Sequence, residues 1–334
     1  MDIKQKYQLA YQKILSAKRI LLVGHISPDG DDLASLCLLG RLSASLGLSR
    51  VLYCEGARSP EFSFLPGIDE IIDSKNKLLD FLSAKDKDDW LDEFDLLITS
   101  DCGSIERTNL AAEIRGRKKT FVIEFDHHQK VSDYSDLEIR QADKSSTAEL
   151  LYHFLDANHL SFDRESATCV LTGIMTDTGN FLYPSASADT LAVASRMLAL
   201  GVNVNRIMGA VLQNKKVATL KLLSRALDNL KINDKQGIAV SVLRPEDFES
   251  CGHDFASEAF DDIVAVLANL ADVKAVLLLR EYESGKIKGS WRSKPGGLDV
   301  SILAKNLGGG GHKHAAGFQV SGHIVWENDF WRVR

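Results

Sequence analysis

The sequence predicts an α/β protein with two domains: an amino-terminal domain built on a parallel sheet, and a smaller α+β domain at the carboxyl end. Three observations predict this class. Short apolar runs alternate with amphipathic helical segments in the first half, which is typical of a parallel sheet with helices on both faces. The turn sequence NDKQG at 233–237 then restarts the pattern. The length of 334 residues suits two ordinary domains.

The elements of the first domain follow in order from these patterns. Helices are expected over 1–18, 33–46, 164–176 and 190–200. A further helix begins at Ser146, because Ser146 and Glu149 have the spacing of a capping box, in which each side chain bonds the backbone amide of the other. The expected strands are the apolar runs at 19–24, 50–55, 95–100 and 120–125.

A long helix over 204–230 is expected to connect the two domains. We therefore divide the chain into a first domain at 1–200, a helical connector at 201–232 and a second domain at 233–334. Strands and helices are mixed in the second domain, which indicates an α+β fold. Its expected elements are a strand at 238–243, a helix at 257–270, a strand at 273–280 and a hairpin partner at 286–293.

Charge, hydropathy and cysteine content exclude several classes of protein. The net charge is −6 and the chain has no basic block, so we expect no protein that tracks long nucleic acids along their backbone. No apolar run approaches the roughly 20 residues that span a bilayer, and the first residues do not resemble a signal peptide. The five cysteines are scattered and form no CxxC pair, which suits reduced thiols. We expect a cytoplasmic protein without a membrane partner.

Acids and histidines directly follow three of the expected strands. Because the carboxyl ends of parallel strands share one edge of a sheet, we expect these side chains to converge there. A carboxylate at the end of the helix over 164–176 could join them. The residues concerned are His25, Asp29 and Asp31 after the first strand, Asp101 after the third, Asp126, His127 and His128 after the fourth, and Asp177 on the helix.

Each of these groups has an ordinary structural explanation by itself. Asp29 could belong to a turn with Pro28 and Gly30, Asp101 could cap a helix, and Asp177 could be a satisfied polar residue. Three titratable groups in a row at 126–128 are harder to explain, since burying them unpaired is costly. Without a metal site, these separate structural explanations would all have to be true at the same edge of the sheet. We therefore favour a metal site.

The chemistry of the set indicates two divalent ions. Carboxylates and imidazoles without thiolates suit Mn²⁺ or Mg²⁺ better than structural zinc. Four aspartates contribute about −4, which two divalent cations would balance. Two ions about 3.5–4 Å apart activate a water molecule and stabilise the entering and leaving oxygens of phosphoester hydrolysis. The predicted ligands are His25, Asp29, Asp31, Asp101, His127 and Asp177.

A glycine-rich segment, GGGGHKHAAG at 308–317, stands out in the second domain. Consecutive glycines let backbone amides approach an anion, and a helix of small residues after them would add its dipole. Such a run is also typical of a flexible loop. Arg292 could grip a phosphate with its planar guanidinium. Trp291 could stack on a base or could be an ordinary core residue.

Together these motifs resemble the DHH phosphoesterase family, in the branch with a DHH-associated carboxyl-terminal domain. Within it they are most similar to the bacterial oligoribonuclease (nano-RNase) and 3′-phosphoadenosine 5′-phosphate phosphatase type. The resemblance covers nearly the whole chain. It rests on HISPDGD at 25–31, Asp101, the name-giving DHH at 126–128, SSTAE at 145–149, DTG at 177–179 and the glycine-rich segment.

The resemblance implies how the two ions are shared, with Mn²⁺ the usual ion and Mg²⁺ the alternative. It implies Asp101 as the bridge between them. His128 would contact the scissile phosphate or give a proton to the leaving oxygen, and Asp126 would orient a histidine. One ion would be bound by His25, Asp29 and Asp101, the other by Asp31, Asp101, His127 and Asp177.

In the second domain the resemblance implies a grip on the far phosphate or base of the substrate. Two departures from the family pattern bear on that grip. Ala34 replaces a frequent glycine, and Leu182 stands where many relatives carry arginine, so that Arg107 or Arg292 would have to replace it. The implied substrate-binding residues are Arg107, Arg292, Ser293, Gly309, Gly310, Gly311 and His312.

We therefore expect hydrolysis of short nucleotides, of two to about four units, to 5′-mononucleotides. The bisphosphate nucleotide and pApA are further expected substrates. An inorganic pyrophosphatase of the same metal architecture is the alternative enzyme, disfavoured by the nucleoside-sized grip around Trp291. A catalytically silent nucleotide sensor would be expected to lack a ligand, and none is missing. Assembly as a homodimer stays open.

Overall fold

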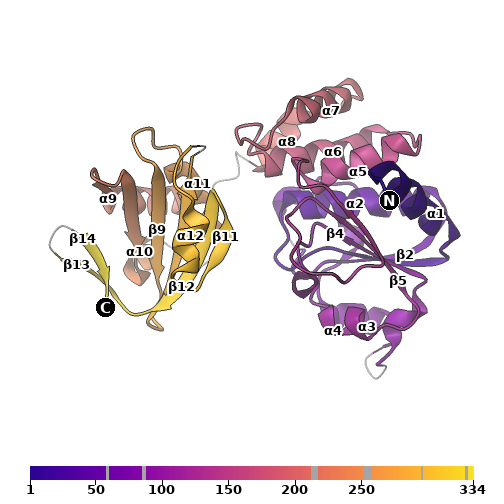
Figure 1. The fold of residues 1–334 in the computed structure, drawn as a ribbon, viewed down its shortest axis with the longest axis horizontal. Coiled ribbons are helices and arrows are strands. Elements are labelled where there is room, and N and C mark those ends of the chain that lie inside the picture. The colour runs from indigo at the N-terminus through magenta and orange to yellow at the C-terminus, as the bar shows by residue number, and fades with distance from the viewer. Residues whose placement is uncertain (58–59, 85–87, 212–216, 252–256, 295, 328–329) are drawn as a thin grey trace. The chain divides into compact units, whose positions relative to one another are not determined.

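The computed structural model describes all residues except 58–59, 85–87, 212–216, 252–256, 295 and 328–329. The chain forms two compact units, Met1–Asn214 and Lys215–Arg334 (Figure 1). Each unit has its own sheet and its own apolar cores. In the part of the chain that is described, no helix is both long enough and apolar enough to cross a membrane.

The first unit is built on six parallel strands in the order β3-β2-β1-β4-β5-β6. The order reverses between β1 and β4, and in open parallel sheets ligands bind outside the carboxyl ends of the strands at such a point. The strands are β1 (Arg19–Val23), β2 (Ser49–Tyr53), β3 (Ile71–Ile72), β4 (Leu96–Ser100), β5 (Phe121–Asp126) and β6 (Leu137–Arg140).

Helices cover both faces of this sheet. Successive strand residues point to opposite faces, so Ile20 and Leu22 join one core while Leu21 and Val23 join the other. One face carries α1 (Ile3–Ser16), α2 (Gly30–Ser45) and α5 (Thr147–Ala157), and α6 (Arg164–Asp177) and α7 (Ala188–Ala199) pack on these helices (Figure 1). The opposite face carries α3 (Lys75–Phe81) and α4 (Ala111–Gly116) (Figure 1). Short 3-10 helices lie at Pro60–Phe62, Ile68–Glu70, Trp90–Glu93 and Ile105–Thr108.

The second unit contains a mixed sheet in the order β11-β12-β10-β9-β8-β7, in which only β8 and β9 are parallel neighbours. A separate hairpin is formed by β13 (Ile324–Glu327) and β14 (Phe330–Val333). The helices are α9 (Val217–Asp228), α10 (Pro245–Cys251), α11 (Ser257–Leu267) and α12 (Val300–Lys305). The sheet strands are β7 (Lys231–Asn233), β8 (Ile238–Leu243), β9 (Ala275–Glu281), β10 (Lys286–Ser293), β11 (Gly310–His312) and β12 (Ala315–Ser321).

The predicted fold class is confirmed, with a parallel sheet first and a second sheet after it. The expected connector helix is helical at both ends, as α8 (Val204–Val211) and α9, while 212–216 lie outside the described residues. The boundary between the units falls inside this expected connector, so α8 belongs to the first unit and α9 to the second.

One local prediction is wrong and another holds only in part. The glycine-rich segment is not followed by a helix, because Ala315–Ser321 forms the strand β12. This strand pairs with β10 along its length and with β11 at Ala315–Gly317, and it buries the alternate residues Ala316 and Phe318. The capping box at Ser146 is only half present: Ser146 Oγ accepts from the Glu149 amide at 3.0 Å, but the Glu149 carboxylate bonds Ser145 instead of the Ser146 amide.

Candidate metal centre

The first group of predicted ligands lies where β1 leads into α2. Asp29 is the N-cap of α2, and its Oδ1 accepts hydrogen bonds from the amides of Asp31 and Asp32, both at 3.1 Å. Its second oxygen, Oδ2, lies 3.8 Å from Nε2 of His25. The capping role therefore uses one carboxylate oxygen and leaves the other directed to the histidine.

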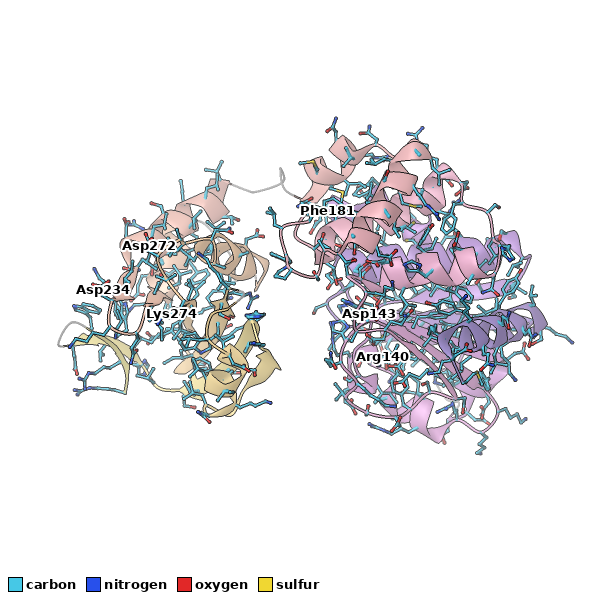
Figure 2. The ribbon with its side chains drawn as sticks, turned by 45° about the horizontal axis from the view of Figure 1, so that its top comes forward. Arg140, Asp143, Phe181, Asp234, Asp272 and Lys274 are labelled. Atoms are coloured by element: carbon cyan, nitrogen blue, oxygen red, sulfur yellow. The ribbon has the colours of Figure 1, made fainter. Side chains whose placement is uncertain are left out.

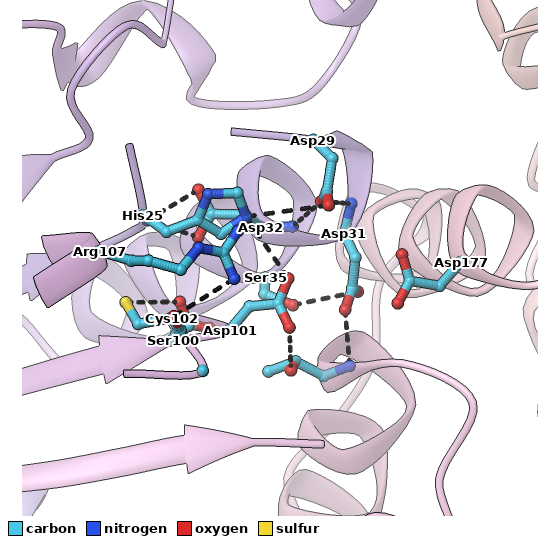
Figure 3. Close-up of polar contacts among 12 residues, drawn as sticks. His25, Asp29, Asp31, Asp32, Ser35, Ser100, Asp101, Cys102, Arg107 and Asp177 are labelled. Carbon is cyan, nitrogen blue, oxygen red and sulfur yellow. Dashed lines mark hydrogen bonds and ion pairs between the residues drawn. The ribbon is translucent and has the colours of Figure 1, made fainter. Parts of the chain in front are cut away.

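Asp101 lies at the centre of the cluster. It follows β4 with a φ of 60°, a left-handed conformation unusual for a residue other than glycine, and it is only 1 % exposed. Its Oδ2 lies 4.0 Å from His25 Nε2, and its Oδ1 lies 3.6 Å from His127 Nε2. Each oxygen of one buried carboxylate thus faces a different histidine. Figure 3 shows Asp101 among side chains from separate elements.

A second group joins the ends of β5 and α6 with the start of α2. His127 Nε2 lies 3.0 Å from Oδ2 of Asp177. Asp31 is held by the amino end of α5, where the amides of Thr147 and Ala148 donate to its two oxygens at 2.6 and 3.0 Å. Ligand atoms of Asp31, His127 and Asp177 all lie within 4.8 Å of one another, and so do those of His25, Asp29 and Asp101.

The two remaining residues of the DHH motif form a pair beside this cluster. Asp126 Oδ1 accepts from the amide and from Nδ1 of His128, at 2.8 and 2.9 Å. Its Oδ2 accepts from the amide of Gly103 at 2.6 Å. His128 Nδ1 also lies 3.5 Å from Oδ1 of Asp101. Asp126 therefore orients His128 next to the carboxylate at the centre.

The donor atoms fit a metal centre. His25 Nδ1 lies 2.9 Å from the carbonyl of Ile26, so this nitrogen carries a proton and, in the neutral ring, Nε2 holds the lone pair. Buried Nε2 atoms of His25 and His127 make no well-aligned hydrogen bond, although carboxylate oxygens lie 3.0–4.0 Å away. Imidazole nitrogens that face a group of carboxylates are suitable ligands for a divalent ion, which binds them after any proton is displaced.

The electrostatics of the cluster point the same way. Burial raises the pKa of Asp101 well above its usual range, and the neighbouring Asp31 carboxylate adds to the rise. Burial and the Asp177 carboxylate likewise raise the pKa of Asp31. Burial would lower the pKa of His127, but the Asp177 carboxylate 3.0 Å away raises it to about 9. These acids are crowded without enough positive charge, which divalent cations would supply.

Arg107 is the one predicted substrate-binding residue in the first unit. Its guanidinium Nη1 donates to the carbonyl of Cys102 at 3.3 Å, and Figure 3 shows it beside His25. The backbone carbonyl of Arg107 also accepts from the amide of Ile26 at 2.7 Å. The arginine thus lies beside the predicted ligands (Figure 3).

The other predicted substrate-binding residues lie in the second unit, where β10 ends and where β11 runs beside the start of β12. Arg292 pairs with Ala315 on β12, and Ala315 pairs with His312 on β11. Ser293 Oγ lies 3.0 Å from Nδ1 of His314, and its amide donates to the carbonyl of His314 at 3.0 Å. The side chain of His312 lies outside the described part of the structure.

Two side chains that support the centre were missed by the sequence analysis. Thr147 Oγ1 donates to Asp101 Oδ1 at 2.7 Å; its place in the SSTAE motif was the available signal. Arg140, labelled in Figure 2, ends β6 and donates from Nη1 to the carbonyl of His128 at 2.7 Å. No sequence signal pointed to Arg140, because the short edge strand that carries it was not predicted.

Comparisons with known proteins agree with this architecture. The DHH family, N-terminal domain, matches residues 19–174, and the DHHA1 domain matches 235–329. The bifunctional oligoribonuclease and PAP phosphatase NrnA of Thermus thermophilus is 30 % identical, over 91 % of this chain and 84 % of its own length. This chain belongs to the DHH family. The NrnA of Bacillus subtilis is 26 % identical to this DHH protein, over 90 % of this chain and 89 % of the relative.

Solved structures show the same fold. An exopolyphosphatase-related protein from Bacteroides fragilis superposes on this DHH protein with a TM-score of 0.84 at 23 % identity, covering 96 % of this chain and 92 % of the other. RecJ of Thermus thermophilus in complex with Mn²⁺ gives 0.54 at 17 % identity, covering 95 % and 51 %. The predicted family is confirmed, including its DHHA1 domain, and the predicted class, a phosphoesterase, agrees with it.

Proposed function

We propose that this DHH protein hydrolyses phosphodiester bonds of short oligonucleotides at a centre for two divalent ions, with Mn²⁺ preferred and Mg²⁺ as the alternative. One observation carries the proposal. The two oxygens of the buried Asp101 carboxylate face His25 and His127 at 4.0 and 3.6 Å, so a single side chain can serve two neighbouring ions. When bound, such ions activate water and stabilise the charge on the reacting phosphate.

The chain's own residues divide the work around Asp101. His25 and Asp29 would complete one ion site, and Asp31, His127 and Asp177 the other. His128, held through Nδ1 by Asp126, would contact the scissile phosphate or give a proton to the leaving oxygen. Arg107 would bind a phosphate oxygen of the substrate.

The second unit would hold the remainder of the substrate. Arg292 and Ser293 on β10 and the backbone of Gly309–Gly311 with His312 are proposed to bind its far phosphate or base. The named activities of the two NrnA relatives support short oligoribonucleotides and the bisphosphate nucleotide as substrates. Leu182 is 81 % exposed and supplies no charge, so we assign phosphate binding to Arg107 and Arg292.

Composition supports the setting in which this activity would occur. All five cysteines are free and buried, which suits a reducing cytoplasm. A net charge of −6 favours a short, locally bound substrate over a long nucleic acid. Both points support the proposed location and substrate length, and neither bears on the reaction at the metal centre.

A substrate panel tests the proposal. The purified protein with Mn²⁺ is given, separately, a 5′-labelled RNA dinucleotide, a long RNA, the bisphosphate nucleotide, pApA and pyrophosphate, and products are separated by chromatography. We expect rapid dinucleotide cleavage to 5′-mononucleotides and slow turnover of the long RNA. Turnover of pyrophosphate alone would replace the proposal with the pyrophosphatase alternative. Nucleotide binding without any turnover would favour the sensor.

A further inference from the structure

The buried carboxylate of Glu149 is explained neither by the metal ligands nor by helix capping. Glu149 lies in the first turn of α5 and is fully buried. Its Oε2 accepts a hydrogen bond from the amide of Ser145 at 3.1 Å, a second from Ser145 Oγ and a third from Thr190 Oγ1 at 2.8 Å. The carboxylate is therefore directed to the turn before the helix.

The peptide group between Lys144 and Ser145 links this carboxylate to the metal centre. Its N–H belongs to Ser145 and donates to Glu149, while its carbonyl belongs to Lys144 and lies 3.3 Å from Nδ1 of His127. A carbonyl has no proton to give, so Nδ1 of His127 is the donor and Nε2 is left for an ion. Hydrogen bonds in a chain polarise one another, so a carboxylate on the N–H strengthens the carbonyl as an acceptor.

We propose that Glu149 is a positioning residue of the metal centre, acting on His127 through the Lys144–Ser145 peptide. It fixes the ring orientation and tautomer of His127 and so tightens the ion site shared with Asp31 and Asp177. A carboxylate that bonds a metal-binding histidine commonly has this effect. Here a peptide group stands between the two side chains. The inference rests on the proposed metal centre.

A third ion site at the same place is disfavoured by charge. Ligand atoms of Glu149, His153 and Asp189 do lie within 4.8 Å of one another. However, Lys144 Nζ lies 2.6 Å from Asp189 Oδ2 and 3.7 Å from Glu149 Oε1, so an ammonium group already provides the positive charge. A divalent cation there would be repelled by this lysine. The same ion pair anchors the turn that carries the Lys144 carbonyl.

The test compares Mn²⁺ binding by the metal-free full chain and by Glu149→Gln, using isothermal titration calorimetry. Glutamine keeps the size and one acceptor oxygen but removes the charge. We expect one of two Mn²⁺ affinities to fall about 10–100-fold and the other to stay unchanged. Thr190→Val is the matched control. It removes the hydroxyl that donates to Glu149 Oε2, and it breaks the capping box of α7, but it leaves the bond between Ser145 and Glu149 in place. It should lower thermal stability and leave both affinities unchanged.

The outcomes separate this inference from the one on which it rests. Glu149→Gln that loses thermal stability like Thr190→Val, with both Mn²⁺ affinities intact, would make Glu149 a purely structural residue and overturn the inference. A wild-type chain that binds fewer than two ions would instead refute the metal centre itself. Should Glu149→Gln not fold, Glu149→Asp keeps the charge but cannot reach Ser145, and the same selective loss of affinity is expected.

Discussion

The metal cluster of the first unit and the glycine-rich edge of the second are built in opposite ways. In the first, mostly buried side chains converge from the ends of β1, β4, β5 and α6 and from the start of α2, and several are held by further hydrogen bonds. In the second, neighbouring strands align Arg292, Ala315 and His312 through their backbone pairing. Chemistry on a phosphate requires charges from several elements at one point, whereas gripping a substrate can use one continuous stretch of sheet.

The largest expected effect tests the convergence in the first unit. Asp101→Ala removes the one carboxylate that faces both histidines, so both ions should be lost together. We expect a fall in kcat of at least about a thousandfold, with fewer than one ion bound per chain by elemental analysis. Asp163→Asn, at the N-cap of α6, is a control that should retain both ions. Retention of one ion by Asp101→Ala would contradict the bridge.

A glycine tests how closely the helices must approach for the cluster to form. A Cβ on Gly173 of α6 would lie 2.3 Å from Asp31 Oδ1 and 2.4 Å from Ala148 Cβ, so Gly173→Ala should displace the Asp31 carboxylate. We expect activity to fall about 10–100-fold, although alanine by itself favours a helix by about 1 kcal/mol. Gly209→Ala on α8 meets nothing within 4 Å and should keep full activity. Equal kinetics for the two variants would show that this close approach is dispensable.

Ion binding by the first unit should depend on pH. In the metal-free protein the Asp177 carboxylate, acting against burial, raises the pKa of His127 to about 9, so below that pH an ion has to displace a proton. Mn²⁺ affinity should therefore rise about tenfold per pH unit up to about pH 9 and level off above it. Calorimetry from about pH 7 to about pH 10 tests this, and a flat profile would contradict it.

Arg292→Ala tests whether the second unit contributes binding alone. Loss of the guanidinium should raise KM about tenfold while kcat and the number of bound ions stay unchanged. Arg332→Ala on β14, exposed in the same unit, is the matched control. Steady-state kinetics on the dinucleotide measure both variants. A fall in kcat with KM unchanged would show that Arg292 acts in the chemical step. The two regions would then not divide catalysis and binding between them.

The smallest effect concerns the glycines themselves. A Cβ on Gly309 would lie 2.1 Å from the carbonyl oxygen of Gly317, so packing alone requires that glycine, whereas a Cβ on Gly310 meets nothing within 4 Å. Gly310→Ala should leave thermal stability unchanged and raise KM a few-fold, by about 1 kcal/mol or less, if substrate approaches this backbone. An unchanged KM would show that these glycines serve strand packing and not substrate binding.

The predictable part of the molecule is the part that local pattern controls. The strands now seen as β1, β2, β4 and β5 were expected within two residues of their ends, because long apolar runs identify buried parallel strands. The edge strands β3 and β6 were not predicted, because they are short and half-exposed. The segment after the glycines is a strand and not the expected helix, because pairing of Ala315–Ser321 with β10, and of Ala315–Gly317 with β11 as well, outweighed local preference.

The sequence by itself determined which groups could do chemistry and at which strand ends they lie, because residue type and strand order are local properties. Only the tertiary structure decided that each oxygen of Asp101 faces a different histidine. It also decided that the Glu149 carboxylate bonds the Lys144–Ser145 peptide, which in turn bonds His127, instead of capping its own helix. These relations join residues far apart in the chain. They depend on packing distances of a few ångströms, which no periodicity encodes.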